Sequence, residues 1–120
     1  MTEEFNFETK GFWYVATPYD KYAEGREKAW IHACAVAGLL MERGHTVYCP
    51  IAHGHAIKKH TSAKLPQTHE FWLAQDKAFT DAAVGLFVVK MPGWEESMGV
   101  QWEIKEFTKA GKPIIYLEWS

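Results

Sequence analysis

The sequence predicts a single α/β domain of the Rossmann-like or flavodoxin-like, three-layer kind, with a parallel sheet of four to five strands. Short apolar runs typical of buried strands alternate along the chain with longer segments of helical periodicity. No linker rich in Pro, Gly or Ser and no internal repeat divides the 120 residues, of which 48% are hydrophobic, enough for one core. We therefore treat residues 1–120 as one domain.

The first predicted strand covers residues 12–16, an apolar run that stops at a Thr-Pro pair. The longest predicted helix follows over residues 21–43, where apolar residues recur at helical spacing and an Arg-Gly pair closes the segment. Residues 46–48 are β-branched or aromatic, and Pro50 follows Cys49, so residues 46–49 form the second predicted strand.

The segment after the second strand is predicted to be a long loop. Residues 51–67 contain three histidines, a glycine and a proline without clear periodicity, and we expect no more than one helical turn among them. Loops of this length are usually functional or mobile.

The remaining elements return to regular patterns. A helix at 68–83 has Thr68 as its candidate N-cap, and a continuous apolar run follows that is typical of a strand buried on both faces. In chain order we predict a helix at 68–83, a strand at 85–91, a helix at 97–110 closed by Gly111, and a strand at 113–117.

This alternation of strands and helices predicts parallel strands, right-handed crossovers and helices on both faces of the sheet. In open sheets of this kind, ligands bind beyond the C-terminal ends of the strands, where the strand order changes direction. That rule selects residues 17–19, 50–55, 92–99 and the end of the chain as the segments that border a ligand crevice.

Composition and charge exclude several classes of protein. The net charge of -2 and the isoelectric point near 6.3 leave no general basic field, so bulk nucleic acid is not an expected partner. The acidic N-terminus does not resemble a secretory signal, and no apolar run approaches the ~20 residues of a membrane span. We therefore expect a cytoplasmic protein, in which Cys34 and Cys49 are small core residues rather than a disulfide.

The histidines do not make a convincing metal motif. His53 and His55 straddle Gly54, but a lone His-x-His without a carboxylate or cysteine at ligand spacing is a weak signal. We expect no metal and no organic cofactor. Two interpretations of His53 remain open. Its side chain contacts a substrate base or phosphate, or it is solvated in the loop.

The last predicted helix contains a carboxylate and an anion-binding end. Val100, Ile104 and Phe107 form an apolar stripe, and Glu103 lies beside it, pointing toward the start of the helix. That start offers Ser97 and free backbone N–H groups, which favour anions, and Gly99, which lets a ligand approach the backbone. The alternative for Ser97 is a simple N-cap.

Several segments together resemble the nucleoside 2-deoxyribosyltransferase-like superfamily, and more narrowly its small bacterial and phage branch with a Gly-Trp-x-x-Ser-x-Gly signature. The resemblance spans residues 12–117, and its most specific part is the Ser-x-Gly-x-x-x-Glu segment that runs from Ser97 to Glu103. The segments that carry it are residues 14–19, residues 50–53, Asp76, residues 92–103 and residues 110–113.

The resemblance implies roles for individual residues. Glu103 matches the nucleophile that attacks the anomeric carbon of a nucleoside sugar, and Asp76 matches the residue that acts with it at the leaving base. Ser97 stands six positions before Glu103, where members that act on deoxynucleoside 5′-monophosphates carry a serine that meets the phosphate. A carboxylate can trap an oxocarbenium-like centre while a second acid protonates the departing nitrogen.

The remaining candidate substrate-binding residues come from the same segments. The family's aromatic contact to the sugar or phosphate matches either Tyr14 or Tyr19, and these alternatives stay open. Trp94 is expected either to stack on a base or to anchor its loop against the domain. The full set of substrate-binding candidates is Tyr14, Thr17, Pro18, Tyr19, His53, Trp94, Ser97 and Gly99.

The sequence thus predicts an N-glycosidase or deoxyribosyltransferase that acts on a small-molecule nucleoside or nucleotide. One alternative is a non-catalytic nucleotide-binding or sensing module on the same fold, which the fold alone does not distinguish from an enzyme. Another is a nucleotide phosphoribohydrolase with a Pro-Gly-Gly-x-Gly-Thr-x-x-Glu loop, but the second glycine and the threonine are absent. Six tryptophans in a small domain also lead us to expect a homo-oligomer.

Overall fold

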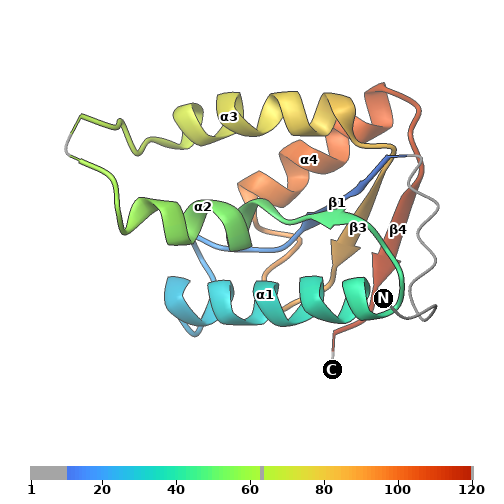
Figure 1. The fold of residues 1–120 in the computed structure, drawn as a ribbon, viewed down its shortest axis with the longest axis horizontal. Helices are drawn as coiled ribbons and strands as arrows, with labels where there is room; N and C mark the ends of the chain where they lie inside the picture. Colours follow the sequence, from blue (N-terminus) through green and yellow to red (C-terminus); the bar gives the residue numbers. More distant parts are fainter. Residues whose placement is uncertain (1–10, 63, 120) are drawn as a thin grey trace, which may run out of the picture.

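The computed structural model describes residues 11–62 and 64–119, and it contains a parallel four-stranded sheet with helices around it (Figure 1). The fold class predicted from the sequence is confirmed. The elements in chain order are β1 (Trp13–Ala16), α1 (Arg26–Glu42), β2 (Val47–Tyr48), α2 (Pro50–Lys58), α3 (His69–Ala82), β3 (Gly85–Val89), α4 (Met98–Lys109) and β4 (Ile114–Leu117).

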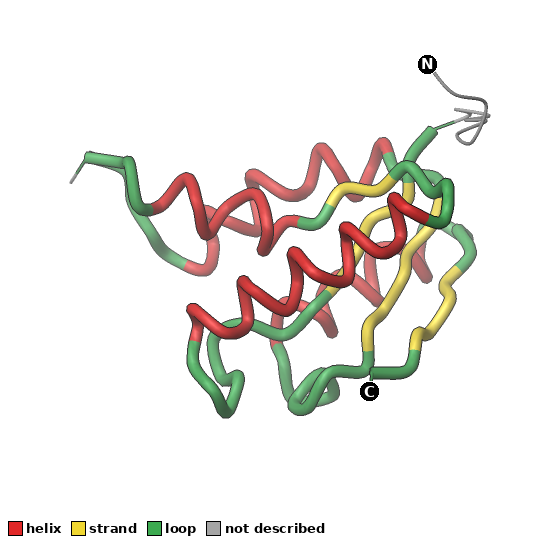
Figure 2. The backbone as a smooth tube through the Cα atoms, turned by 60° about the horizontal axis from the view of Figure 1, so that its bottom comes forward, coloured by secondary structure: helices red, strands yellow, loops and turns green. Residues whose placement is uncertain are grey.

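The strand order is β2-β1-β3-β4, with every neighbouring pair parallel. The chain moves from β1 to one side to form β2 and then crosses to the other side to form β3 and β4. The order therefore changes direction between β1 and β3, and a crevice is expected beyond the C-terminal ends of these two strands. Figure 2 shows the same sheet from another side, with helices on both of its faces.

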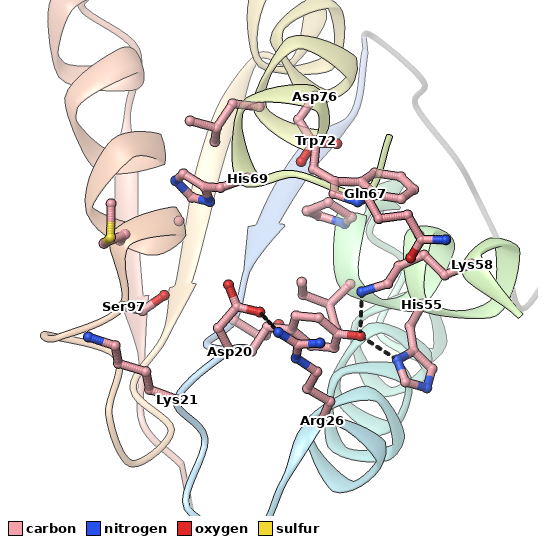
Figure 3. A pocket seen from close by; sticks show the side chains of 18 of the residues that line it. Asp20, Lys21, Arg26, His55, Lys58, Gln67, His69, Trp72, Asp76 and Ser97 are labelled. Carbon is pink, nitrogen blue, oxygen red and sulfur yellow. Dashed lines mark hydrogen bonds and ion pairs between the residues drawn. The ribbon is translucent and has the colours of Figure 1, made fainter. Parts of the chain in front are cut away.

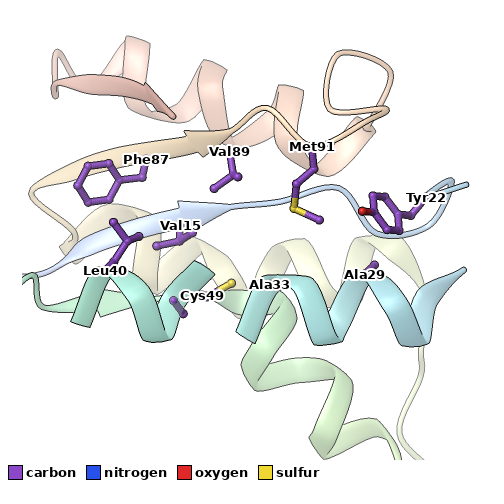
Figure 4. Close-up of a cluster of buried hydrophobic side chains, with 10 residues drawn as sticks. Val15, Tyr22, Ala29, Ala33, Leu40, Cys49, Phe87, Val89 and Met91 are labelled. Carbon is purple, nitrogen blue, oxygen red and sulfur yellow. The ribbon is translucent and has the colours of Figure 1, made fainter. Parts of the chain in front are cut away.

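Side chains of β1 alternate between two hydrophobic clusters. Val15 faces α1, where it lies in one cluster with Ala29, Ala33 and Leu40 (Figure 4). Tyr14 faces the other way, into the second cluster, which consists of Tyr14, Ala16, Ala83, Leu86, Val88, Val100 and Phe107. Because the buried side of α1 consists largely of alanine, that helix can lie close to the sheet.

Helix α2 corrects the prediction of a long loop over residues 51–67. Pro50 occupies the first turn of this helix, where a residue without an N–H group is well tolerated. Gly54 is buried and lies against the Trp72 ring of α3, and the Trp30 indole of α1 donates to the Ala52 carbonyl oxygen at 3.3 Å. Contacts with neighbouring helices, rather than an amphipathic pattern, stabilise α2, so periodicity could not reveal it.

Other element boundaries differ by a few residues from those predicted. Helix α1 begins at Arg26 rather than at residue 21, because Gly25 has a φ of 93° and two turns precede it. Thr68 caps α3 as predicted, since its side chain accepts a hydrogen bond from the Phe71 N–H. Strand β3 is buried throughout, as predicted, but ends at Val89 where the chain turns.

The two cysteines differ in burial. Cys49 is buried at the end of β2, as predicted, whereas Cys34 is exposed, so the prediction that both lie in the core is wrong for Cys34. Ala33 and Ala37 occupy the buried side of α1. Cys34 follows Ala33 by one residue and is therefore rotated by about 100° around the helix axis, toward solvent.

A pair of glycine substitutions tests the packing of the sheet. An added Cβ at Gly85 would overlap the Trp13 ring on the adjacent strand, so we expect Gly85→Ala to lower the free energy of unfolding by about 1–3 kcal/mol. Chemical denaturation measures this difference.

The control is Gly38→Ala in α1, where no atom lies within 4 Å of an added Cβ. Alanine there should raise the free energy of unfolding by about 0.5–1 kcal/mol through its higher helix propensity. Equal effects of the two substitutions would contradict the packing described for Gly85.

Candidate functional site

A pocket of about 550 Å³ lies beyond the C-terminal ends of the strands (Figure 3). Its walls come from the segment after β1, from the start of α1, from α2 and α3, and from the start of α4. This is where the strand order places a ligand crevice. Its lining residues include Thr17, Tyr19, Arg26, His55, Lys58, Trp72, Asp76, Ser97 and Gly99.

A buried carboxyl group of α4 is hydrogen-bonded to strand β1 beside this pocket. The Tyr14 hydroxyl of β1 donates a hydrogen bond to Glu103 Oε2 of α4 at 2.6 Å. Tyr14 is completely buried and Glu103 is 6% exposed. Glu103 does not line the pocket itself, but it lies one turn after Gly99, which does. The predicted position of Glu103 beside the apolar stripe of this helix agrees with its burial.

Asp76 completes a group of three acids with Tyr14 and Glu103. This half-buried residue of α3 lines the pocket, and its carboxylate is also close enough to the Tyr14 hydroxyl to be stabilised by it. The structure therefore brings together the two carboxyl groups to which the sequence assigned the chemistry. Tyr14 is hydrogen-bonded to Glu103 and does not itself line the pocket.

Burial keeps these acids protonated to unusually high pH. It raises the pKa of Asp76 to about 6, although hydrogen bonding to Tyr14 acts in the opposite direction. Burial also raises the pKa of Glu103 well above its usual value, the Tyr14 hydroxyl opposes that shift, and the negative charge of Asp76 adds to it. Burial thus favours the protonated form of both carboxyl groups, and the charge of Asp76 favours that of Glu103 further.

The start of α4 forms another part of the pocket wall. Ser97 caps the helix, because its hydroxyl accepts a hydrogen bond from the Val100 N–H at 3.2 Å. Ser97 and Gly99 both line the pocket, so the free N–H groups of the first turn border the space where a ligand would bind. Glu95 and Glu96 are exposed and do not line it, so their charges lie outside the pocket.

The opposite wall contains a chain of hydrogen bonds that the sequence did not predict. Lys58 Nζ donates to the Tyr19 hydroxyl at 3.0 Å, and that hydroxyl lies 2.7 Å from His55 Nδ1. His55 Nε2 lies 3.1 Å from Glu27 Oε1, and the ring stacks on Trp30. His55 and Lys58 are three residues apart, a spacing that would have placed them on one face had α2 been recognised as a helix.

The remaining candidate residues occupy different places. Thr17 is buried and lines the pocket, whereas Pro18 is buried without lining it. His53 is an exposed residue of α2 that borders a separate cavity of about 170 Å³. Trp94 packs beside Tyr116 of β4 and does not line the pocket. Tyr14 meets the carboxylate and Tyr19 forms part of the pocket wall, so the two alternatives for the aromatic residue have distinct positions.

Two further observations concern the described residues as a set. Within residues 11–62 and 64–119, no three side chains of His, Cys, Asp or Glu come together as a metal site requires. In the same part of the chain, no helix combines the length and the apolar character needed to cross a bilayer.

Comparison with known proteins gives a family for the chain. No curated protein matches it closely enough to be called a relative. The family described as "Domain of unknown function (DUF1937)" matches residues 11–119. The match covers every helix and strand and all of the candidate site residues. The chain therefore belongs to the DUF1937 family.

Proposed function

We propose that this protein cleaves the N-glycosidic bond of a nucleoside or nucleotide through Glu103, as a hydrolase or a deoxyribosyltransferase. The observation that carries the proposal is the buried hydrogen bond from Tyr14 to Glu103 beside Asp76, at the edge of a pocket of about 550 Å³. A cavity of this size is typical of small-molecule sites. The resemblance of residues 12–117 to the nucleoside 2-deoxyribosyltransferase-like superfamily supports the same chemistry.

The proposed reaction requires one proton to be shared between the two carboxyl groups. In the productive form Asp76 carries the proton and Glu103 is ionised. The Glu103 carboxylate attacks the anomeric carbon and forms a glycosyl ester, the C–N bond breaks, and its electron pair leaves with the base. Asp76 transfers its proton to a base nitrogen, and water or a second base then cleaves the ester.

Tyr14 assists this reaction by positioning and stabilising Glu103. Its hydroxyl donates to Oε2, which favours the carboxylate form, and its own raised pKa keeps it a donor at neutral pH. Its one hydrogen goes to Glu103, so Tyr14 positions Glu103 rather than Asp76. The two carboxyl groups titrate as a coupled pair.

The start of α4 is proposed to hold a 5′-phosphate. The capping hydrogen bond uses one lone pair of the Ser97 hydroxyl, and the first-turn N–H groups beside Gly99 border the pocket. The positive end of the helix dipole favours an anion at this position.

A non-catalytic nucleotide-binding module is the second candidate function. The burial of Glu103, which is 6% exposed, and its raised pKa favour it, because both make the carboxylate less available to attack carbon. Incubation with a panel of nucleosides and nucleotides separates the two functions. Release of free base supports the enzyme, whereas a raised melting temperature without release supports the binding module.

We also propose that the chain forms a homo-oligomer. All six tryptophans are half-buried, but the edge strand β4 leaves Ile115 and Tyr116 more than 40% exposed, at 43% and 44%. An edge strand with exposed apolar side chains is a common site of association.

Replacement of the proposed nucleophile is the first functional test. Glu103→Gln keeps the size of the side chain and an oxygen that accepts from Tyr14, so the fold should survive. The amide cannot form the glycosyl ester, and we expect base release to fall by at least about 1,000-fold while nucleotide binding persists. Chromatography of the released base and calorimetric titration of the nucleotide measure the two properties.

The melting temperature of the same variant serves as the control. A structural role for Glu103 would instead lower stability by about 1–3 kcal/mol and leave activity per folded molecule unchanged. A folded Glu103→Gln protein with full activity would rule out the nucleophile.

The raised pKa of Asp76 predicts a pH dependence of stability. A carboxyl group with a folded pKa of about 6 and an ordinary unfolded value stabilises the protein most at low pH, and this contribution is lost as the pH rises through 6. We therefore expect Asp76→Asn to gain about 1.4 kcal/mol in unfolding free energy relative to the wild type between pH 5 and pH 7.5. Urea denaturation at the two pH values measures this gain.

Asp81→Asn is the matched control, because Asp81 is exposed on the same helix. If the Asp76 and Asp81 variants respond to pH in the same way, burial does not raise the Asp76 pKa.

Substitution of Ser97 tests the proposed phosphate site. Aspartate is a good N-cap, so Ser97→Asp should keep α4 intact while placing a negative charge at its start. We expect affinity for nucleoside 5′-monophosphates to fall at least about tenfold, while affinity for the corresponding nucleosides changes little. Equal losses for both ligands would place the phosphate elsewhere, and Ser97→Thr, which keeps a hydroxyl, is the control.

A further inference from the structure

Lys58 is a cation in the pocket wall without a carboxylate partner among the described residues. It is half-buried, and in residues 11–62 and 64–119 no acidic side chain lies within salt-bridge distance of its ammonium group. Arg26, by contrast, is paired with Asp20 at 3.0 Å. A partly desolvated ammonium group without a counter-charge favours a ligand that supplies hydrogen-bond acceptors.

The position of this ammonium group is fixed by its neighbours. It donates to the Tyr19 hydroxyl at 3.0 Å and lies 4.6 Å from the centre of the Tyr19 ring and 6.0 Å from that of Trp72 (Figure 3). Cation–π attraction to two rings adds to the hydrogen bond. Lys58 is thus held against the pocket wall and need not be ordered by the ligand.

Two further residues lie behind Lys58. His55 Nε2 donates to the Glu27 carboxylate, which only accepts, and His55 Nδ1 lies 2.7 Å from the Tyr19 hydroxyl. The Tyr19 oxygen accepts from Lys58. The remaining N–H bonds of the ammonium group are available to a ligand.

A second donor on this wall also lacks a partner. The buried indole N–H of Trp72 makes no hydrogen bond with any described residue, and Trp72 lines the pocket with Lys58. The oxygen of Tyr19 already accepts from Lys58. Because that N–H is buried, the wall formed by Lys58, Tyr19 and Trp72 offers the ammonium group of Lys58 as its donor, together with aromatic surface on which a planar group can lie.

We propose that the wall formed by Lys58, Tyr19 and Trp72 binds the base of the substrate and selects bases that carry a carbonyl oxygen there over bases that carry an amino group. This inference rests on the proposed function, in which the sugar lies at Asp76 and Glu103 and the phosphate at Ser97. The wall with Lys58 is then the part of the pocket left for the base. Lys58 donates a charge-assisted hydrogen bond to the base carbonyl.

The same contact assists departure of the base. When the C–N bond breaks, its electron pair goes to the base, and in an oxo base the negative charge spreads onto the carbonyl oxygen. Lys58 stabilises this charge through the hydrogen bond, and the proton from Asp76 then neutralises the ring nitrogen. A contact that strengthens as charge develops lowers the barrier as well as the dissociation constant.

The test compares four purine ligands that differ in only two features. They are 2′-deoxyinosine, 2′-deoxyadenosine and their 5′-monophosphates, which vary the group at C6 and the phosphate independently. Dissociation constants are measured calorimetrically on the full chain carrying Glu103→Gln, with and without Lys58→Gln. The matched control is Lys28→Gln, an exposed lysine of α1 outside the pocket.

We expect the Glu103→Gln protein to bind the oxo ligand on the order of tenfold more tightly than the amino ligand, both among the nucleosides and among the 5′-monophosphates. A difference of this size is the effect of one charged hydrogen bond. Lys58→Gln should abolish this ratio and leave the effect of the phosphate unchanged, and Lys28→Gln should change neither. If Lys58→Gln instead removes the effect of the phosphate, Lys58 binds the anion and the inference is wrong. An unchanged oxo-to-amino ratio in the Lys58 variant would also overturn it.

The proposed function is judged separately, by release of base from wild-type protein. If the wild type binds the four ligands with the predicted ratio but releases no base, the inference about base recognition holds and the proposed reaction is wrong. If the wild type and the Lys58→Gln variant both release hypoxanthine and adenine at equal rates, the proposed reaction holds and the inference about selectivity is wrong.

Discussion

The hydrogen bond between Tyr14 and Glu103 links the central strand to the last helix across the interior of the protein. A buried carboxyl group without a partner is unfavourable, and Tyr14 supplies that partner from the middle of the sheet. The bond spans 89 residues of sequence, so it forms only when β1 and α4 are both in place. The position of α4 then determines where its first turn, with Ser97 and Gly99, meets the pocket.

The two sides of the pocket differ in chemistry because different layers of the fold supply them. Helix α3 contributes Asp76 and helix α4 contributes its N-terminus, with Glu103 buried one turn further along. Helices α1 and α2, with the segment after β1, contribute Lys58, Tyr19 and His55. A ligand between these layers would meet Asp76 on one side, and Lys58 together with the Asp20–Arg26 ion pair on the other.

Burial of the acids has a consequence for the fold as well as for the chemistry. Because their pKa values are raised, ionisation of Asp76 and Glu103 lowers the free energy of unfolding. The two acids therefore reduce the stability of the fold that holds them. Natural proteins tolerate such groups mainly at functional sites. The alanine-lined contact of α1 and the fully buried strand β3 supply stabilising contacts elsewhere in the fold.

The sequence by itself determined the α/β fold class, because strands buried in a parallel sheet leave apolar runs and amphipathic helices leave a regular period. It also determined the N-caps Thr68 and Ser97 and the buried side of Glu103, since capping and helical spacing are local properties. Only the tertiary structure decided that residues 50–58 form a helix, that Cys34 faces solvent, and that Trp94 packs outside the pocket. The chain from Lys58 through Tyr19 and His55 to Glu27 joins side chains 28 to 39 residues apart, and contacts at that separation depend on packing between elements, which no local pattern records.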